Sequence, residues 1–91
     1  MALCFSFSPP SMTAEQYDNA IRRLEAAGAS NPPGRLYHLC FGTGDKLKVV
    51  DVWESQEAFQ KFGETLMPIM NDIGLDPGQP NAEPIHNIIR G

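Results

Sequence analysis

Hydrophobic and polar positions follow two different periods in the first third of the chain. Residues 3–8 alternate between large apolar side chains and small or polar ones, which is the period of two of a half-buried strand. Thr13 and, three residues later, Gln16 have the spacing of a capping box, which predicts that a helix begins there. Its apolar stripe includes Tyr17, and Gly28 supplies a left-handed stop.

The middle of the chain has the pattern of a β-hairpin. Apolar residues at 36–41 and 46–53 predict two strands, and the glycine-rich segment 42–45 predicts the turn between them. A last strand is expected over residues 85–89 because three isoleucines lie there.

A second helix is predicted between Ser55, a good N-cap residue, and Gly74. Apolar residues keep helical spacing throughout this segment. Pro68 lacks a backbone donor, so we expect it to kink or break the helix near residues 65–67 and to shape the mouth of a pocket.

The resulting order, β-α-β-β-α-β, is that of a single ferredoxin-like α+β domain spanning residues 1–91. Four antiparallel strands should carry both helices on one face. The strands nevertheless bear apolar residues on both faces: Val49 and Trp53 alternate with Val50 and Val52. A bare apolar sheet face is unusual in a monomer, so the sequence predicts a homodimer.

Composition and charge narrow the class of protein. The 91 residues are 42% hydrophobic and 20% charged, which excludes wholesale disorder, and a net charge of −4 argues against nucleic-acid binding. No apolar stretch approaches the roughly 20 residues that cross a bilayer, so no membrane association is expected. Two cysteines without C-x-x-C spacing favour a reducing, cytoplasmic location.

Residues 49–59, VVDVWESQEAF, resemble the dimeric α+β barrel superfamily, in particular its antibiotic-biosynthesis-monooxygenase-like proteins. That superfamily also includes haem-degrading enzymes, lactone isomerases, polyketide cyclases and small proteins without a known activity. The resemblance therefore implies a fold and a homodimeric α+β barrel, and it does not choose a reaction.

In monooxygenase-like members the pocket lies between the helices and the sheet, and a tryptophan at this strand end contributes to it. The resemblance thus implies a pocket role for Trp53. Strand alternation places Val49 on the same face, and the second helix brings two phenylalanines over it. The predicted binding residues for a small apolar or aromatic ligand are Trp53, Phe59, Phe62, Val49 and Tyr37.

Two departures from the family pattern bear on the chemistry. Phe62 stands where many relatives carry a histidine, and Val49 replaces an asparagine of the monooxygenases. Both weaken a transfer of haem degradation or phenol oxygenation, and no cofactor and no metal are expected.

Asp51 is the most informative polar residue because it interrupts an apolar strand on the predicted pocket face. It is either a general base with a raised pKa or a structural carboxylate paired with an arginine or a backbone amide across the dimer. His38 and His86 are further catalytic candidates on predicted strands. Tyr37 and His38 exchange faces on a one-residue shift of register, so either could reach the pocket. Arg35 is interpreted as a solvated surface charge.

These residues support two functions of different class; a third, a haem-binding relative, is disfavoured because Phe62 stands in place of the histidine of the second helix. The first is a cofactor-independent monooxygenase or isomerase that acts on an aromatic or polyketide-like molecule. The second is a non-catalytic, dimeric ligand-binding or stress-related protein with the same cavity.

Overall fold

A computed structural model describes residues 2–91 and has the predicted order of elements. The elements are β1 (Leu3–Phe7), α1 (Ala14–Ala26), β2 (Arg35–Phe41), β3 (Lys48–Trp53), α2 (Gln56–Ile73) and β4 (Asn81–Pro84). Within residues 2–91, no helix is both long enough and apolar enough to cross a membrane.

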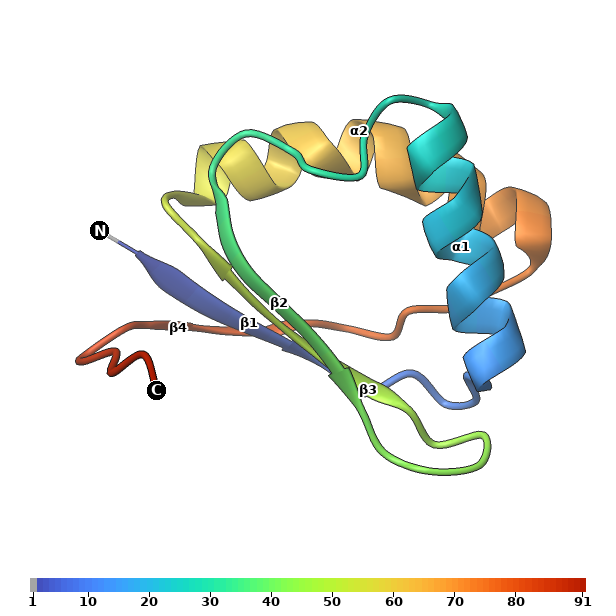
Figure 1. Ribbon diagram of the computed structural model, residues 1–91, viewed down its shortest axis with the longest axis horizontal. Coiled ribbons are helices and arrows are strands. Elements are labelled where there is room, and N and C mark those ends of the chain that lie inside the picture. The colour runs from blue at the N-terminus through green and yellow to red at the C-terminus, as the bar shows by residue number, and fades with distance from the viewer. Residues whose placement is uncertain (1) are drawn as a thin grey trace.

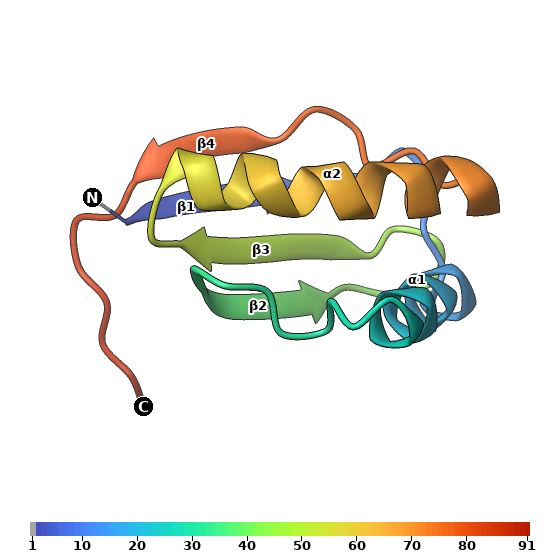
Figure 2. The same ribbon diagram turned by 90° about the horizontal axis from the view of Figure 1, so that it is seen from above.

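The four strands form one antiparallel sheet in the order β2-β3-β1-β4. Both helices lie on the same face of this sheet (Figure 1). Figure 2 shows α2 running along β1 and β3, whereas α1 is seen end-on beside β2. The ferredoxin-like prediction is therefore confirmed, and the two helices approach the sheet in different directions.

The capping residues predicted for the two helices form the expected hydrogen bonds. The Thr13 side chain accepts a hydrogen bond from the Gln16 amide at 3.2 Å, and the Gln16 side chain accepts one from the Thr13 amide at 2.9 Å. The Ser55 hydroxyl caps α2 by accepting from the Ala58 amide at 3.2 Å, and Gly74 ends that helix with a φ of 70°. These contacts satisfy backbone groups that a helix end otherwise leaves unpaired.

The predicted break at Pro68 is wrong, because α2 is continuous from Gln56 to Ile73. Pro68 lies on the exposed side of the helix, as does Glu64, whose carbonyl loses its usual donor. Water can solvate that carbonyl, while Met70 and its inward-facing neighbours hold the helix against the sheet.

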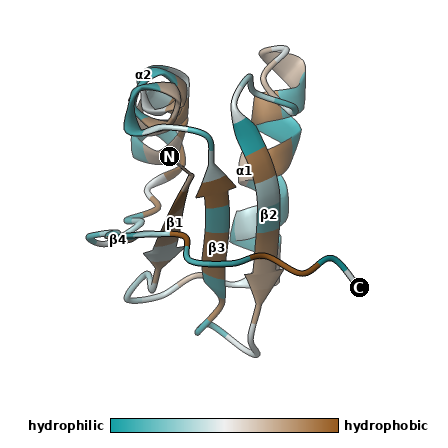
Figure 3. Cartoon of the chain, turned by 90° about the vertical axis from the view of Figure 1, so that its left-hand side faces the viewer, coloured by the Kyte–Doolittle hydropathy of each residue, from teal (hydrophilic) through white to brown (hydrophobic). Residues whose placement is uncertain are grey.

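The last strand also lies elsewhere than predicted. β4 is formed by Asn81–Pro84, which pairs with β1, rather than by the isoleucine-rich residues 85–89. An edge strand needs only backbone pairing on one side, so this polar segment forms it without apolar alternation. Beyond β4 the chain crosses the sheet on the face opposite the helices (Figure 3), where the Arg90 guanidinium lies 5.1 Å from the centre of the Tyr37 ring.

The core lies between the helices and the inner face of the sheet, in two clusters. The buried residues of the first are Phe5, Leu24, Trp53 and Phe62. Those of the second are Met12, Ala20, Met70 and Leu75. The outer face of β2, by contrast, exposes Leu36, Tyr37, Leu39 and Phe41 by 42%, 41%, 58% and 44%.

Candidate functional site

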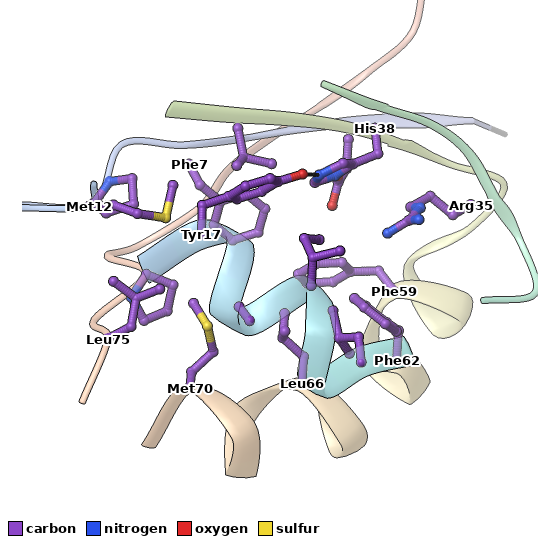
Figure 4. A pocket seen from close by; sticks show the side chains of 17 residues that line it. Phe7, Met12, Tyr17, Arg35, His38, Phe59, Phe62, Leu66, Met70 and Leu75 are labelled. Carbon is purple, nitrogen blue, oxygen red and sulfur yellow. Dashed lines mark hydrogen bonds and ion pairs between the residues drawn. The ribbon is translucent and has the colours of Figure 1, made fainter. Parts of the chain in front are cut away.

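A cavity of about 80 Å³ lies between the two helices and the inner face of the sheet (Figure 4). Its walls are almost entirely apolar and come from β1, β2, β3 and both helices. The polar exceptions are Tyr17, Arg35, His38 and Asp51. Few polar groups in an apolar, concave site are the usual composition of a small-molecule pocket.

Three of these polar side chains form one hydrogen-bonded chain. The His38 Nδ1 lies 2.5 Å from the Asp51 Oδ1, and the His38 Nε2 lies 2.6 Å from the Tyr17 hydroxyl oxygen. The hairpin places His38 directly opposite Asp51 in the β2–β3 register. The rings of Tyr17 and His38 are nearly parallel, at an interplanar angle of 6°. Asp51 also accepts a 3.4 Å hydrogen bond from the indole Nε1 of Trp53.

The surroundings of the site act on the pKa of Tyr17. Burial raises this pKa; the negative charges of an ionised Cys40, of Asp51 and of Asp18 raise it further, and the Arg35 charge opposes them. Tyr17 is therefore a neutral phenol at neutral pH. The two contacts of the His38 ring fit a neutral imidazole whose Nδ1 donates to the Asp51 carboxylate and whose Nε2 accepts from the Tyr17 hydroxyl.

Arg35 faces the cavity because β2 is irregular at its start. The register between β2 and β3 shifts between Arg35 and Tyr37, so Arg35 and His38 both come to the inner face. The guanidinium lies 5.8 Å from the centre of the Phe62 ring and donates a hydrogen bond to the Ser30 carbonyl at 3.0 Å. The interpretation of Arg35 as a solvated surface charge was wrong.

The structure separates the two neighbouring candidates on β2. His38 faces the cavity, whereas Tyr37 lies opposite Val52 and is exposed on the outer face. His86 lies beyond β4, exposed and outside the cavity, so it does not join the other catalytic candidates. Its predicted strand does not form.

The remaining predicted residues lie near one another, with one difference of role. Val49, Phe59 and Phe62 line the cavity as expected. Trp53 is completely buried behind them, with its ring centre 5.3 Å from that of Phe62, and it does not line the cavity. Its contact with the site is the hydrogen bond to Asp51. A residue at the end of β3, under α2, is too deeply packed to meet a ligand.

Asp51 is buried at 5% exposure and holds a fixed partner, so it is not the isolated base that one interpretation required. Within the chain this partner is the histidine His38. Tyr17 was missed because its position in the apolar stripe of α1 suggests packing alone. The signal was its hydroxyl, the one strongly polar group in that stripe.

The fold is shared with antibiotic biosynthesis monooxygenases. A candidate antibiotic biosynthesis monooxygenase from Chloroflexus aurantiacus J-10-fl superposes with a TM-score of 0.66 and 17% identity, over 100% of both chains. SnoaB, a cofactor-independent oxygenase from Streptomyces nogalater, gives 0.63 and 18% identity over 99% of this chain and 96% of its own. At this identity the likeness establishes the fold alone. No protein-family model and no curated protein sequence matches the chain.

Proposed function

We propose that this protein binds a phenolic or polyketide-like aromatic molecule in its cavity and removes a proton from it, as a cofactor-independent monooxygenase or isomerase. The observation that carries the proposal is the Tyr17–His38–Asp51 chain in an otherwise apolar cavity. A base oriented by a third group is the usual arrangement for proton abstraction.

The proton would move in a relay. The substrate gives its proton to the Tyr17 oxygen while Tyr17 gives its own proton to the Nε2 of His38. Tyr17 stays neutral, and the imidazolium formed is stabilised by the Asp51 carboxylate. Arg35 provides the positive charge that a substrate anion needs; its charge acts on Tyr17, where it lowers the pKa of the hydroxyl.

The anion could then react in either of two ways. In a monooxygenase, dioxygen converts a ring CH₂ into a ketone: one oxygen atom becomes the carbonyl oxygen, and the other leaves as water with both hydrogens. The substrate thus supplies all four electrons. In an isomerase, the proton returns to a different carbon. The shared fold with SnoaB, itself a cofactor-independent oxygenase, favours the oxygen chemistry.

The test uses a panel of single-ring and two-ring phenols and tetralones, with oxygen uptake and solvent deuterium exchange as readouts. Replacing Tyr17 by Phe removes the relay oxygen and should slow turnover by about 10²-fold or more. The matched control, Tyr37→Phe, removes a hydroxyl from the outer face and should leave the rate unchanged. Full activity in Tyr17→Phe would contradict the relay. Ligand binding without exchange or uptake would instead identify a non-catalytic binding protein.

We also propose that the functional unit is a homodimer whose sheets face each other. The outer face of β2 exposes four large apolar side chains, and the C-terminal segment covers only part of the sheet. Stable dimers of this kind bury on the order of 2,000 Å² in total. A second copy would remove these side chains from water.

A further inference from the structure

Helix α2 presents two adjoining stripes of side chains to two different spaces. The stripe that faces the cavity is Phe59, Phe62, Leu66 and Met70. The stripe that faces a groove on the surface is Ala58, Lys61, Phe62 and Thr65. Both have helical spacing, and Phe62 is the one residue that belongs to both.

The groove lies between α2 and the loop of residues 28–34, with a volume of about 320 Å³. Phe62 is 7% exposed and forms the wall between the groove and the cavity. Arg35 lies over this ring and holds the carbonyl of Ser30, in the same loop. One aromatic side chain therefore separates the cavity from a larger neighbouring space.

We propose that the groove is a second subsite for the ligand of the cavity, that it takes an uncharged, hydroxylated extension such as a sugar ring, and that Phe62 is the movable partition between them. The inference rests on the proposed function, because it assumes that the aromatic ring of that ligand occupies the cavity. Phe62 would swing aside for the bond that joins the two parts.

The lining of the groove suits the two sides of a sugar ring. Its apolar surface includes Pro32, Ala58 and Phe62, which can pack against the C–H face. The polar side chains that line it are Asn31, Glu54, Lys61 and Thr65. Because Glu54 and Lys61 carry opposite charges, neither an anion nor a cation is favoured, and neutral hydroxyl groups can hydrogen-bond to either.

The size of the cavity explains why a second subsite is needed. A space of about 80 Å³ holds several water molecules and is small for a whole substrate of several rings. A larger substrate extends beyond the cavity, through its opening or past a side chain in its wall. Phe62 is the wall residue that the groove shares, so rotation of its ring would join the two spaces.

The experiment compares two probes that share a phenol ring: 4-methoxyphenol and 4-hydroxyphenyl β-glucoside. They differ only by a methyl group in place of the glucosyl group. Binding is followed by ¹H–¹⁵N NMR, with the indole N–H of Trp53, the single tryptophan of the wild-type chain, as the reporter of the cavity. The tryptophan variants below add a second indole signal, which is identified by comparison with the wild-type spectrum. Thr65→Trp fills the groove from an exposed position, and Glu64→Trp places the same side chain on α2 outside the groove.

Wild-type protein should bind both probes. Thr65→Trp should weaken binding of the glucoside at least tenfold and change the Kd for 4-methoxyphenol less than twofold, and Glu64→Trp should change neither. Phe62→Leu, which shortens the partition and keeps an apolar core residue, should shift the Kd ratio in favour of the glucoside. Equal effects of Thr65→Trp on both probes, or no effect on either, would overturn the subsite.

The two proposals fail differently in this experiment. If wild-type protein binds 4-methoxyphenol and excludes the glucoside, the cavity proposal stands and the groove is not a subsite. If neither probe binds at millimolar concentration, the ligand proposed for the cavity is itself wrong, and the subsite is rejected with it.

Discussion

Replacing Asp51 by Asn tests whether the carboxylate orients His38. Asp51 accepts from both the His38 Nδ1 and the Trp53 Nε1. Asparagine has one acceptor oxygen and an amide that donates, so one of these donors would meet another donor. We expect the imidazole to change tautomer, with its proton on Nε2 and the lone pair on Nδ1. Nε2 could then no longer accept the Tyr17 proton.

The size of the effect follows from burial. The Asp51 side chain is 8% exposed, so the lost hydrogen bond to a charged group is poorly replaced by water. Such bonds contribute about 1.5–3 kcal/mol to the free energy of unfolding. For a domain of this length, a loss of 2 kcal/mol lowers Tm by about 8–16 °C. If the protein is an enzyme, the misplaced proton should slow turnover by about 10²-fold or more.

The tautomer can be measured before any substrate is known. Long-range ¹H–¹⁵N NMR distinguishes a protonated from an unprotonated ring nitrogen, and the wild-type protein should show the proton of His38 on Nδ1. Asp45→Asn is the matched control, because it removes the same charge from an exposed turn. A proton on Nε2 in the wild-type protein, or the same tautomer in wild type and Asp51→Asn, would refute the relay.

Three further predictions concern stability and assembly. The Tyr17 hydroxyl ionises near pH 10.0 in the unfolded chain and at a higher pH in the folded protein, because its pKa is raised there. The free energy of unfolding of the wild-type protein should therefore fall as the pH rises above 10, and it should fall less in Tyr17→Phe, as measured by denaturation at pH 9–12. Leu39→Glu, on the outer sheet face, should convert the dimer into a monomer, whereas Met67→Glu on α2 should not. Light scattering distinguishes a dimer of about 20 kDa from the 10.0 kDa monomer. Pro68→Ala should raise the free energy of unfolding by about 2 kcal/mol in urea titration, since the exposed helix regains a donor; a loss would contradict the solvated carbonyl.

The fold was predictable because its signals are local. The capping box of Thr13 and Gln16, the Ser55 cap and the two hydrophobic periods each act within a few residues. The two errors have one cause: tertiary contacts override local preference. Packing of α2 against the sheet tolerates Pro68, and the free edge of β1 takes the segment that reaches it, which is Asn81–Pro84 rather than the isoleucines that follow.

The site was only half predictable. Alternation along β3 predicted that Val49 and Asp51 lie on the inner face of the sheet. The partner of Asp51, however, depends on how β2 aligns with β3. Tyr17 depends on where α1 crosses the sheet. Neither relation is encoded in the spacing of one element, so a pattern along the sequence cannot show that three distant residues share hydrogen bonds.

The irregularity at the start of β2 decides which chemistry the cavity holds. In a regular strand Arg35 and His38, three residues apart, would lie on opposite faces. The shift between Arg35 and Tyr37 brings both to the inner face, so the cavity gains a fixed positive charge as well as a base. A cavity with His38 and Asp51 alone could accept a proton and would have no counter-charge for the anion left behind. The irregularity at the start of β2 thus supplies the positive charge that the proposed reaction needs for the substrate anion. It does so without any change in the residues of the hydrogen-bonded chain.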